Sequence, residues 1–213
     1  MRKSGFMKID KSQMIMNKYS QMISNVLLGI FCLLFVIIYA RQFLLTSRPS
    51  LVLYMVLNGI YLIFALKRRS AKEVDIHFLS WLFTFGGTLL PILALPSSTK
   101  GFFLGYFLQT FGIIISIVGI CSLNKSFGLL AANRGIVTSG LFKFVRHPLY
   151  FSYSVSILGF VLNNCSYYNV FLFSTHFFCQ IQRIKYEEKI LAKDPKYRSY
   201  MTNTKYRLIP YVY

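Results

Sequence analysis

Four long apolar runs, separated by short polar segments, constrain the fold of this chain more than any other feature. The runs are Ile23 to Ala40, Leu51 to Leu66, Phe78 to Leu95 and Phe102 to Leu123. Each is close to the ~20 residues that an α-helix needs to cross a hydrocarbon core of about 30 Å. Only 14% of the residues are charged and 55% are hydrophobic, whereas about a quarter of the residues of a soluble domain are charged. The sequence therefore predicts a membrane protein in which these runs are four spanning helices.

Two shorter apolar runs follow, Leu149 to Leu162 and Tyr168 to Ile181, and the polar segment Asn163 to Ser166 joins them. With about 14 residues each, they either cross a thinned bilayer or form a hairpin that turns back within it. In both cases their outer ends emerge on the same face. The predicted fold class is all-α: a polytopic membrane protein with about six transmembrane segments, of which the last two are a short helical hairpin.

Two local patterns refine this prediction. Pro91 lies inside the third apolar run and should kink that helix, because proline lacks the N–H group of the helical ladder. Gly112 and Ser116 are four residues apart in the fourth run, and small residues at this spacing allow two helices to approach closely.

The basic residues predict the orientation in the membrane. Of the 24 Lys and Arg residues, 21 lie in the N-terminal segment, in 67–77, in 124–148 and after Ile181, and only three lie in the intervening segments. By the positive-inside rule the first face is cytoplasmic, with both termini on it. We predict a basic arm over residues 1–22, four transmembrane helices over 23–123, and a cofactor-binding core with a cytoplasmic tail over 124–213. The arm either lies on an anionic leaflet or is a solvated tail.

The composition also excludes several classes of function. The net charge of +18 is compatible with nucleic acid, but the basic residues lie between apolar runs, so lipid headgroups are the predicted partner. The four cysteines form no disulfide framework and no metal-binding pattern. Glu73, Asp75 and His77 are interpreted as a solvated loop, and a backbone carbonyl is expected to bind His176 within its apolar run. Glycine-rich phosphate loops and nucleophile elbows are missing from the sequence.

The candidate site consists of two parts of the sequence: the segment from Arg134 to Tyr150, and the neighbouring residues Glu187 and Glu188. Pro148 is well suited to the first position of the fifth helix. Arg146 and His147 would then lie at a helix N-terminus, where a carboxylate or phosphate binds well, although the basic side chains are also suited to anchoring the helix at the interface. Farther along, Arg183 and Glu187 are four residues apart, which suits either a helical ion pair or a site at the membrane surface.

The order of these motifs resembles that of the isoprenylcysteine carboxyl methyltransferase and phospholipid methyltransferase superfamily. The matching elements are, in order, Val137-Thr-x-Gly140, the aromatic Phe142, Arg146-His-Pro-x-Tyr150, a short apolar hairpin, Glu187-Glu-x-x-Leu191, Tyr197-x-x-Tyr200 and Arg207-x-x-Pro210. The resemblance covers about residues 124 to 210. It implies an integral membrane enzyme that uses S-adenosylmethionine.

The resemblance also implies roles for single residues. It implies cofactor contacts from Arg134, Gly135, Ile136, Val137, Phe142, His147, Pro148, Leu149, Tyr150 and Glu187. The helix N-terminus and the paired carboxylates add Arg146 and Glu188 to this set. Arg183 corresponds to a basic residue that faces the methyl acceptor, and it is the predicted catalytic residue.

The chain departs from the family pattern at three positions. Ser152 replaces a frequent Gly, which is expected to narrow the approach of the helix to a ligand. Phe142 lacks the hydroxyl of the more usual Tyr, and Asp194-Pro195 replaces an aromatic-Gly pair.

The predicted function is S-adenosylmethionine-dependent methyl transfer to a lipidic or lipid-linked acceptor at the cytoplasmic face. The acceptor is either a carboxylate, such as that of an isoprenylcysteine, or an amine. For an amine or thiol some group must accept a proton, and Glu188 and Tyr150 are the candidates. One alternative is an NADPH-dependent enzyme that resembles membrane sterol and steroid reductases. A second alternative is a non-catalytic membrane module.

Overall fold

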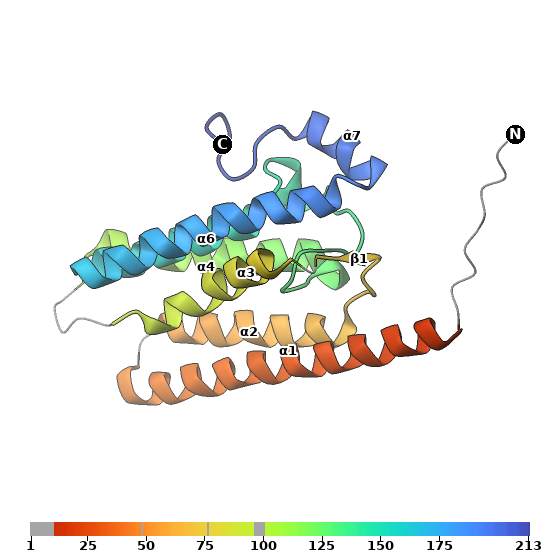
Figure 1. Ribbon diagram of the computed structural model, residues 1–213. Coiled ribbons are helices and arrows are strands. Elements are labelled where there is room, and N and C mark those ends of the chain that lie inside the picture. The colour runs from red at the N-terminus through yellow and green to blue at the C-terminus, as the bar shows by residue number, and fades with distance from the viewer. Residues whose placement is uncertain (1–10, 48, 76, 96–100) are drawn as a thin grey trace, which may run out of the picture.

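A computed structural model describes residues 11–47, 49–75, 77–95 and 101–213. This part of the chain is mostly helical (Figure 1). The α-helices are α1 (Lys11–Thr46), α2 (Pro49–Lys67), α3 (Phe78–Leu89), α4 (Phe103–Leu123), α5 (Pro148–Asn163), α6 (Tyr167–Leu191) and α7 (Pro195–Asn203). Three 3-10 turns, η1 (Leu90–Leu93), η2 (Asn124–Ser126) and η3 (Gly140–Lys143), and two short strands, β1 (Glu73–Val74) and β2 (Ala132–Asn133), complete the elements.

The long helices lie side by side in an elongated bundle (Figure 1). Helix α1 packs on α2, α2 on α4, α4 on α5, and α3 on α6. The C-terminal end of α2, the β1 segment, the loop 124–147 and α7 lie at the same end of this bundle (Figure 1). We call it the basic end, because three of the four Lys- and Arg-rich segments meet there.

Three helices of the described chain are long and apolar enough to cross a membrane: Asn25–Leu45, Ser50–Lys67 and Phe103–Ser126. They correspond to the first, second and fourth predicted spans. The apolar helices Phe78–Leu93 and Pro148–Asn163 are shorter. The structure therefore confirms a helical fold with membrane-spanning character, while the number of six segments and the cytoplasmic position of both termini stay predictions.

The third predicted span changes conformation at Pro91. The α-helix α3 ends at Leu89, and the 3-10 turn η1, which contains Pro91, follows it. Proline has no N–H group to bond to the carbonyl four residues earlier, so the α-helical ladder cannot continue through this position. The expected effect of Pro91 is confirmed, although the α-helix ends at Leu89 and does not continue as a kinked helix to the predicted end of the span at Leu95.

Helix α1 is longer than the apolar run that predicted it. It begins at Lys11 rather than at Ile23 and continues to Thr46. Residues 11–22 are thus helical and continuous with the first span, while residues 1–10 of the predicted basic arm lie outside the described residues. Contact of this arm with lipid stays a prediction.

Helices α4 and α5 meet through small residues, as the Gly112 and Ser116 spacing predicted. A Cβ atom at Gly112 would lie 2.6 Å from the backbone nitrogen of Ser156. The Ser116 and Ser152 hydroxyls lie 2.7 Å apart and share a hydrogen bond. Ser152 is fully buried in this contact. It packs against α4, whereas the sequence had led us to expect that it would narrow the approach of the helix to a ligand.

A two-residue antiparallel ladder ties the α2–α3 connection to the loop after α4. Glu73 pairs with Asn133 and Val74 with Ala132, and the Asp75 N–H donates to the Ala131 carbonyl at 2.9 Å. Asp75 is only 3% exposed, and its carboxylate accepts from the His77 N–H at 3.1 Å. The prediction of a solvated loop is wrong at Asp75, because the loop beside it covers this residue.

The contact between α4 and α5 leads to a first prediction. Gly112→Ala should destabilise the folded protein by about 1–3 kcal/mol, because the added methyl group meets backbone atoms that cannot move aside. Gly59→Ala is the matched control, since no atom lies within 4 Å of a Cβ there and Ala favours a helix over Gly. Thermal unfolding in detergent measures both variants. Equal transition temperatures would contradict the close packing.

Candidate functional site

A cavity of about 450 Å³ connects the basic end of the bundle with its interior. Its outer part is bounded by the loop after α4, the start of α5, the end of α6 and α7. Its inner part is lined by aromatic and apolar side chains from α1, α2, α4 and α5, among them Tyr54, Tyr61 and Tyr153. The cavity therefore joins a polar mouth to an apolar interior.

The strip Arg134 to Val137 forms one wall of the outer part. Gly135 has a φ of +106°, which L-residues with a side chain rarely adopt, and its N–H donates to the side chain of Asn133 at 3.0 Å. The Arg134 guanidinium donates to the Arg69 carbonyl at 2.6 Å, but its Nε is buried without a hydrogen-bond partner. Burial, together with the charge of Arg68, lowers the pKa of Arg134 to about 10.

An aromatic cluster continues this wall of the outer part, and Ile136 and Val137 pack against it. Phe142 from η3 packs against Tyr197 and Tyr200 from α7, and the Tyr200 hydroxyl donates to the Phe142 carbonyl at 2.6 Å. The Tyr197 hydroxyl is buried and has no partner among the described residues. A buried hydroxyl of this kind requires an explanation, and a ligand in the adjoining cavity provides one.

The carboxylate of Glu188 joins three parts of the chain. Its Oε1 accepts from Arg146 Nε at 2.7 Å and lies 3.2 Å from His147 Nε2, both at the start of α5. Its Oε2 accepts from Arg207 Nε in the C-terminal tail at 2.8 Å. Arg146 also donates to the carbonyls of Thr204 and Lys205, so this cluster fixes the tail against α5 and α6.

These contacts determine the protonation of Glu188. Burial alone would raise its pKa, but hydrogen bonds from His147 and Arg146 outweigh burial and lower the pKa from 4.5 to about 2. A carboxylate with such a low pKa is a poor proton acceptor near neutral pH. Both of its oxygen atoms are also occupied, which disfavours Glu188 as the group that accepts a proton from an acceptor.

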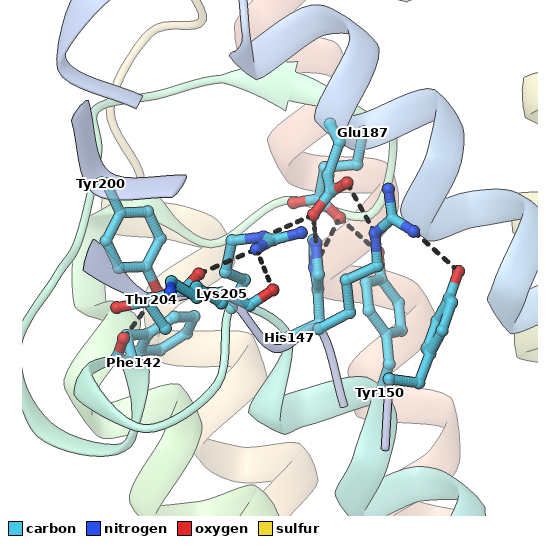
Figure 2. A network of polar contacts seen from close by, with 11 residues as sticks. Phe142, His147, Tyr150, Glu187, Tyr200, Thr204 and Lys205 are labelled. Atoms are coloured by element: carbon cyan, nitrogen blue, oxygen red, sulfur yellow. Dashed lines mark hydrogen bonds and ion pairs between the residues drawn. The ribbon is translucent and has the colours of Figure 1, made fainter. Parts of the chain in front are cut away.

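Glu187, the neighbouring residue, is placed differently. Its side chain is 27% exposed and lines the cavity. Its Oε2 accepts from the Tyr150 hydroxyl at 2.7 Å (Figure 2), and the guanidinium of Arg183 lies 4.9 Å from the centre of the Tyr150 ring. Within the described residues, Arg183 and Glu187 form no ion pair, so the simple helical pair considered from the sequence is absent.

Arg183 lies where the outer and inner parts of the cavity meet. Its guanidinium donates to Gln180 Oε1 at 3.2 Å, to Thr88 Oγ1 at 3.5 Å and to the Leu129 carbonyl at 3.1 Å. A guanidinium has five N–H groups, so two remain for a ligand once these contacts within the described chain are made. The residue is 8% exposed, which gives it a fixed position.

Most of the predicted site residues come together at this cavity. Those that line it are Arg134, Gly135, Ile136, Val137, Phe142, Arg146, His147, Leu149, Tyr150, Arg183 and Glu187. Two predicted residues, Pro148 and Glu188, do not line it. Pro148 is the first residue of α5, as expected, and the contacts of Glu188 favour a structural role, so a cofactor contact from either of them stays a prediction.

Sequence reasoning assigned no role to three residues that the structure places at the site. Tyr197 and Tyr200 line the cavity, and Arg207 binds Glu188. The Tyr-x-x-Tyr and Arg-x-x-Pro motifs contain these residues and were the signals available in the sequence. The described residues contain no group of three or more His, Cys, Asp or Glu side chains that could hold a metal ion.

Glu188 provides a test of this arrangement. Glu188→Gln should destabilise the protein by about 3–5 kcal/mol, because it leaves buried cations without their counter-charge. The pKa of Glu188 is lower in the folded than in the unfolded chain, so its stabilisation is complete above about pH 4.5 and decreases as the pH falls toward 2. Thermal unfolding between pH 7 and pH 3 should show this decrease in the wild type and a flatter profile in Glu188→Gln.

The same substitution at the neighbouring carboxylate, Glu187→Gln, is the control and should cost much less stability, since Glu187 is partly exposed. Equal loss of stability in the two variants would contradict the structural role of Glu188.

Comparison with known families assigns the region that contains this site. Residues 105–193 match the isoprenylcysteine carboxyl methyltransferase (ICMT) family. A search of curated proteins finds no match. The matched region contains nearly all of α4, the loop with Arg134 to Val137, and all of α5 and α6. These elements carry the cavity wall described above, and the family is one of membrane methyltransferases. Residues 105–193, the part of the chain that carries most of the site, are thus similar to the isoprenylcysteine carboxyl methyltransferase family.

Proposed function

We propose that this protein transfers a methyl group from S-adenosylmethionine to a lipidic or lipid-linked acceptor. The observation that carries the proposal is the single cavity in which the outer residues of the family motif meet an apolar chamber between the helices. A water-soluble cofactor can enter such a cavity through the polar mouth, and a hydrophobic acceptor can enter it from between the helices. The two molecules would then meet inside the cavity. Arg183 lies at that point.

The residues of the outer part fit the chemistry of S-adenosylmethionine. The Glu187 carboxylate can accept hydrogen bonds from hydroxyl groups, while Arg134 retains an unpaired buried Nε for an anionic group. The Tyr197 hydroxyl has no partner, and Phe142, Ile136 and the other apolar side chains offer a surface for a planar base. When bound, S-adenosylmethionine supplies the activated methyl group, so the protein has to position the acceptor and exclude water.

The contacts of Arg183 favour a carboxylate as the group that is methylated. Two guanidinium N–H groups are available, and a guanidinium binds a carboxylate through two parallel hydrogen bonds. A carboxylate acceptor is already deprotonated near neutral pH, so no general base is needed. Amine acceptors would require one, and the Tyr150–Glu187 pair is then better placed than Glu188, whose pKa is near 2. We infer that the acceptor is a lipid-linked carboxylate, such as an isoprenylcysteine.

The arrangement of the basic segments supports a cytoplasmic site. The 124–147 loop and the end of α6 lie at the basic end of the bundle (Figure 1), which the positive-inside rule assigns to the cytoplasm. S-adenosylmethionine would then enter from the cytoplasm.

Cofactor binding tests the proposal. We expect the purified wild-type protein to bind S-adenosylmethionine with micromolar affinity, and Glu187→Gln and Tyr197→Phe to weaken binding at least tenfold, a loss of about 1.4 kcal/mol. Calorimetry in detergent measures the three affinities. Tyr168→Phe is the matched control, because Tyr168 lies at the other end of α6 and its hydroxyl contacts the Leu93 carbonyl.

Two outcomes would reject the proposal. Binding of NADPH in place of S-adenosylmethionine would favour an enzyme that resembles the sterol reductases. Binding of neither cofactor by the folded protein would favour a non-catalytic membrane module.

A further inference from the structure

The C-terminal tail ends in a turn with an exposed apolar tip. We call residues 209–212 the apolar turn. Tyr211 is 88% exposed and Val212 is 76% exposed, and Ile209 and Pro210 are exposed as well. A cluster of exposed apolar side chains marks a surface that contacts another protein or a membrane. The position and the chemistry of the apolar turn decide between these two partners.

The backbone contacts of the tail show which way the apolar turn points. The N–H group of Arg146 donates to the Tyr206 carbonyl at 2.9 Å. The next N–H group, that of His147, donates to the next carbonyl, that of Arg207, at 2.8 Å. The tail therefore runs parallel to the segment that leads into α5, an apolar helix, and the turn lies beyond the start of this helix. In Figure 1 the tail runs back from α7 along the bundle, away from its basic end.

The backbone around the apolar turn suits contact with lipid. The N–H groups of residues 207–209 donate to the Tyr213 carbonyl at 2.8, 2.7 and 3.1 Å. Those of Val212 and Tyr213 donate to the Ile209 carbonyl at 3.2 and 3.1 Å, and Pro210 has no N–H group. Lipid chains supply no hydrogen-bond acceptor, so a segment that contacts them must pair its backbone groups internally. The turn largely meets this condition.

The residues beside the apolar turn suit the polar layer of a leaflet. Residues 195–213 contain two Lys, two Arg and no Asp or Glu, and exposed Lys side chains at a membrane surface attract anionic headgroups. Lys205 is exposed in this way. The rings of Tyr206 and Tyr211 lie 5.1 Å apart, and tyrosine is enriched at membrane–water interfaces. Charge complementarity thus favours a lipid surface over a protein.

We propose that the apolar turn inserts into the leaflet at the basic end of the bundle. Tyr211 and Val212 lie among the acyl chains, and Lys205 lies at the headgroup phosphates. Arg207, two residues before the turn, binds Glu188 Oε2. Insertion of the turn therefore holds the tail on the cluster that fixes the site. The inference does not depend on methyl transfer, because it concerns only the contact between the tail and the membrane.

Quenching of tryptophan fluorescence by the lipid tests the insertion. The chain contains one tryptophan, Trp81, which Trp81→Phe removes. In that background, Tyr211→Trp and Val212→Trp each place a single indole in the apolar turn. Ser199→Trp is the matched control, because Ser199 is exposed on α7. The full-length proteins are reconstituted in nanodiscs of phosphatidylcholine and phosphatidylglycerol, with or without bromine in the acyl chains.

Brominated acyl chains should quench the fluorescence at positions 211 and 212 at least twofold, and the water-soluble quencher acrylamide should have little effect there. Position 199 should show the opposite pattern. Quenching of positions 211 and 212 by acrylamide alone would overturn the proposal, because the turn would then be solvated. Quenching by neither agent would also overturn it, because a protein, such as a second copy of this chain, would then cover the turn.

Hydrogen exchange in the same nanodiscs tests the connection to the site. Because Val212 is largely exposed, a charge at this position is costly only if lipid surrounds it. Val212→Asp should therefore speed the exchange of the amides of residues 206–209 at least tenfold. Val212→Thr, which keeps the shape without a charge, should exchange like the wild type. Unchanged exchange in α4 and α5 shows that both variants are folded. Equal exchange of residues 206–209 in the two variants would overturn the anchoring role of the turn.

Discussion

The carboxylate of Glu188 is the interaction on which the geometry of the site depends. It is buried, and it binds Arg146 and His147 at the start of α5 and Arg207 in the C-terminal tail. Loss of one partner from a buried ion pair leaves an uncompensated charge, which strongly destabilises the fold. These contacts therefore hold α5, α6 and the tail in one arrangement. The same cluster positions two further residues, which hydrogen-bond to each other. They are Tyr150, about one turn after His147 on α5, and Glu187, the residue before Glu188 on α6.

A second set of contacts connects the membrane part of the chain to the site. Pro91 interrupts α3 and cannot donate to the buried Gly87 carbonyl. Gln180 donates to this carbonyl instead, and Gln180 in turn contacts Arg183 and His176. The residue that breaks a helix thereby orients the side chain proposed to hold the acceptor. The two ends of α6 line different parts of the cavity. The end near Glu187 faces the polar mouth, and His176 faces the apolar interior.

The sequence predicted the helical, membrane-spanning character of the fold and most of the residues that line the outer cavity. Both predictions rest on strong local signals: long apolar runs, and a motif order that places Arg146-His-Pro and Glu187 at facing helix ends. The β1–β2 ladder was missed, because two-residue strands have no periodicity. The partners of Glu188 and Asp75 and the inner cavity wall were also out of reach, because they depend on which side chains the packing of distant segments brings together.

Direct photolabelling measures the central claim, that S-adenosylmethionine binds between the loop after α4 and the α6–α7 region. The full-length protein is irradiated with S-adenosyl-[methyl-³H]methionine, and labelled peptides are identified by mass spectrometry. The account predicts label in peptides from 124–150 and from 187–200, and its removal by excess unlabelled S-adenosylhomocysteine. Label confined to other segments, or label that the competitor does not remove, would contradict it.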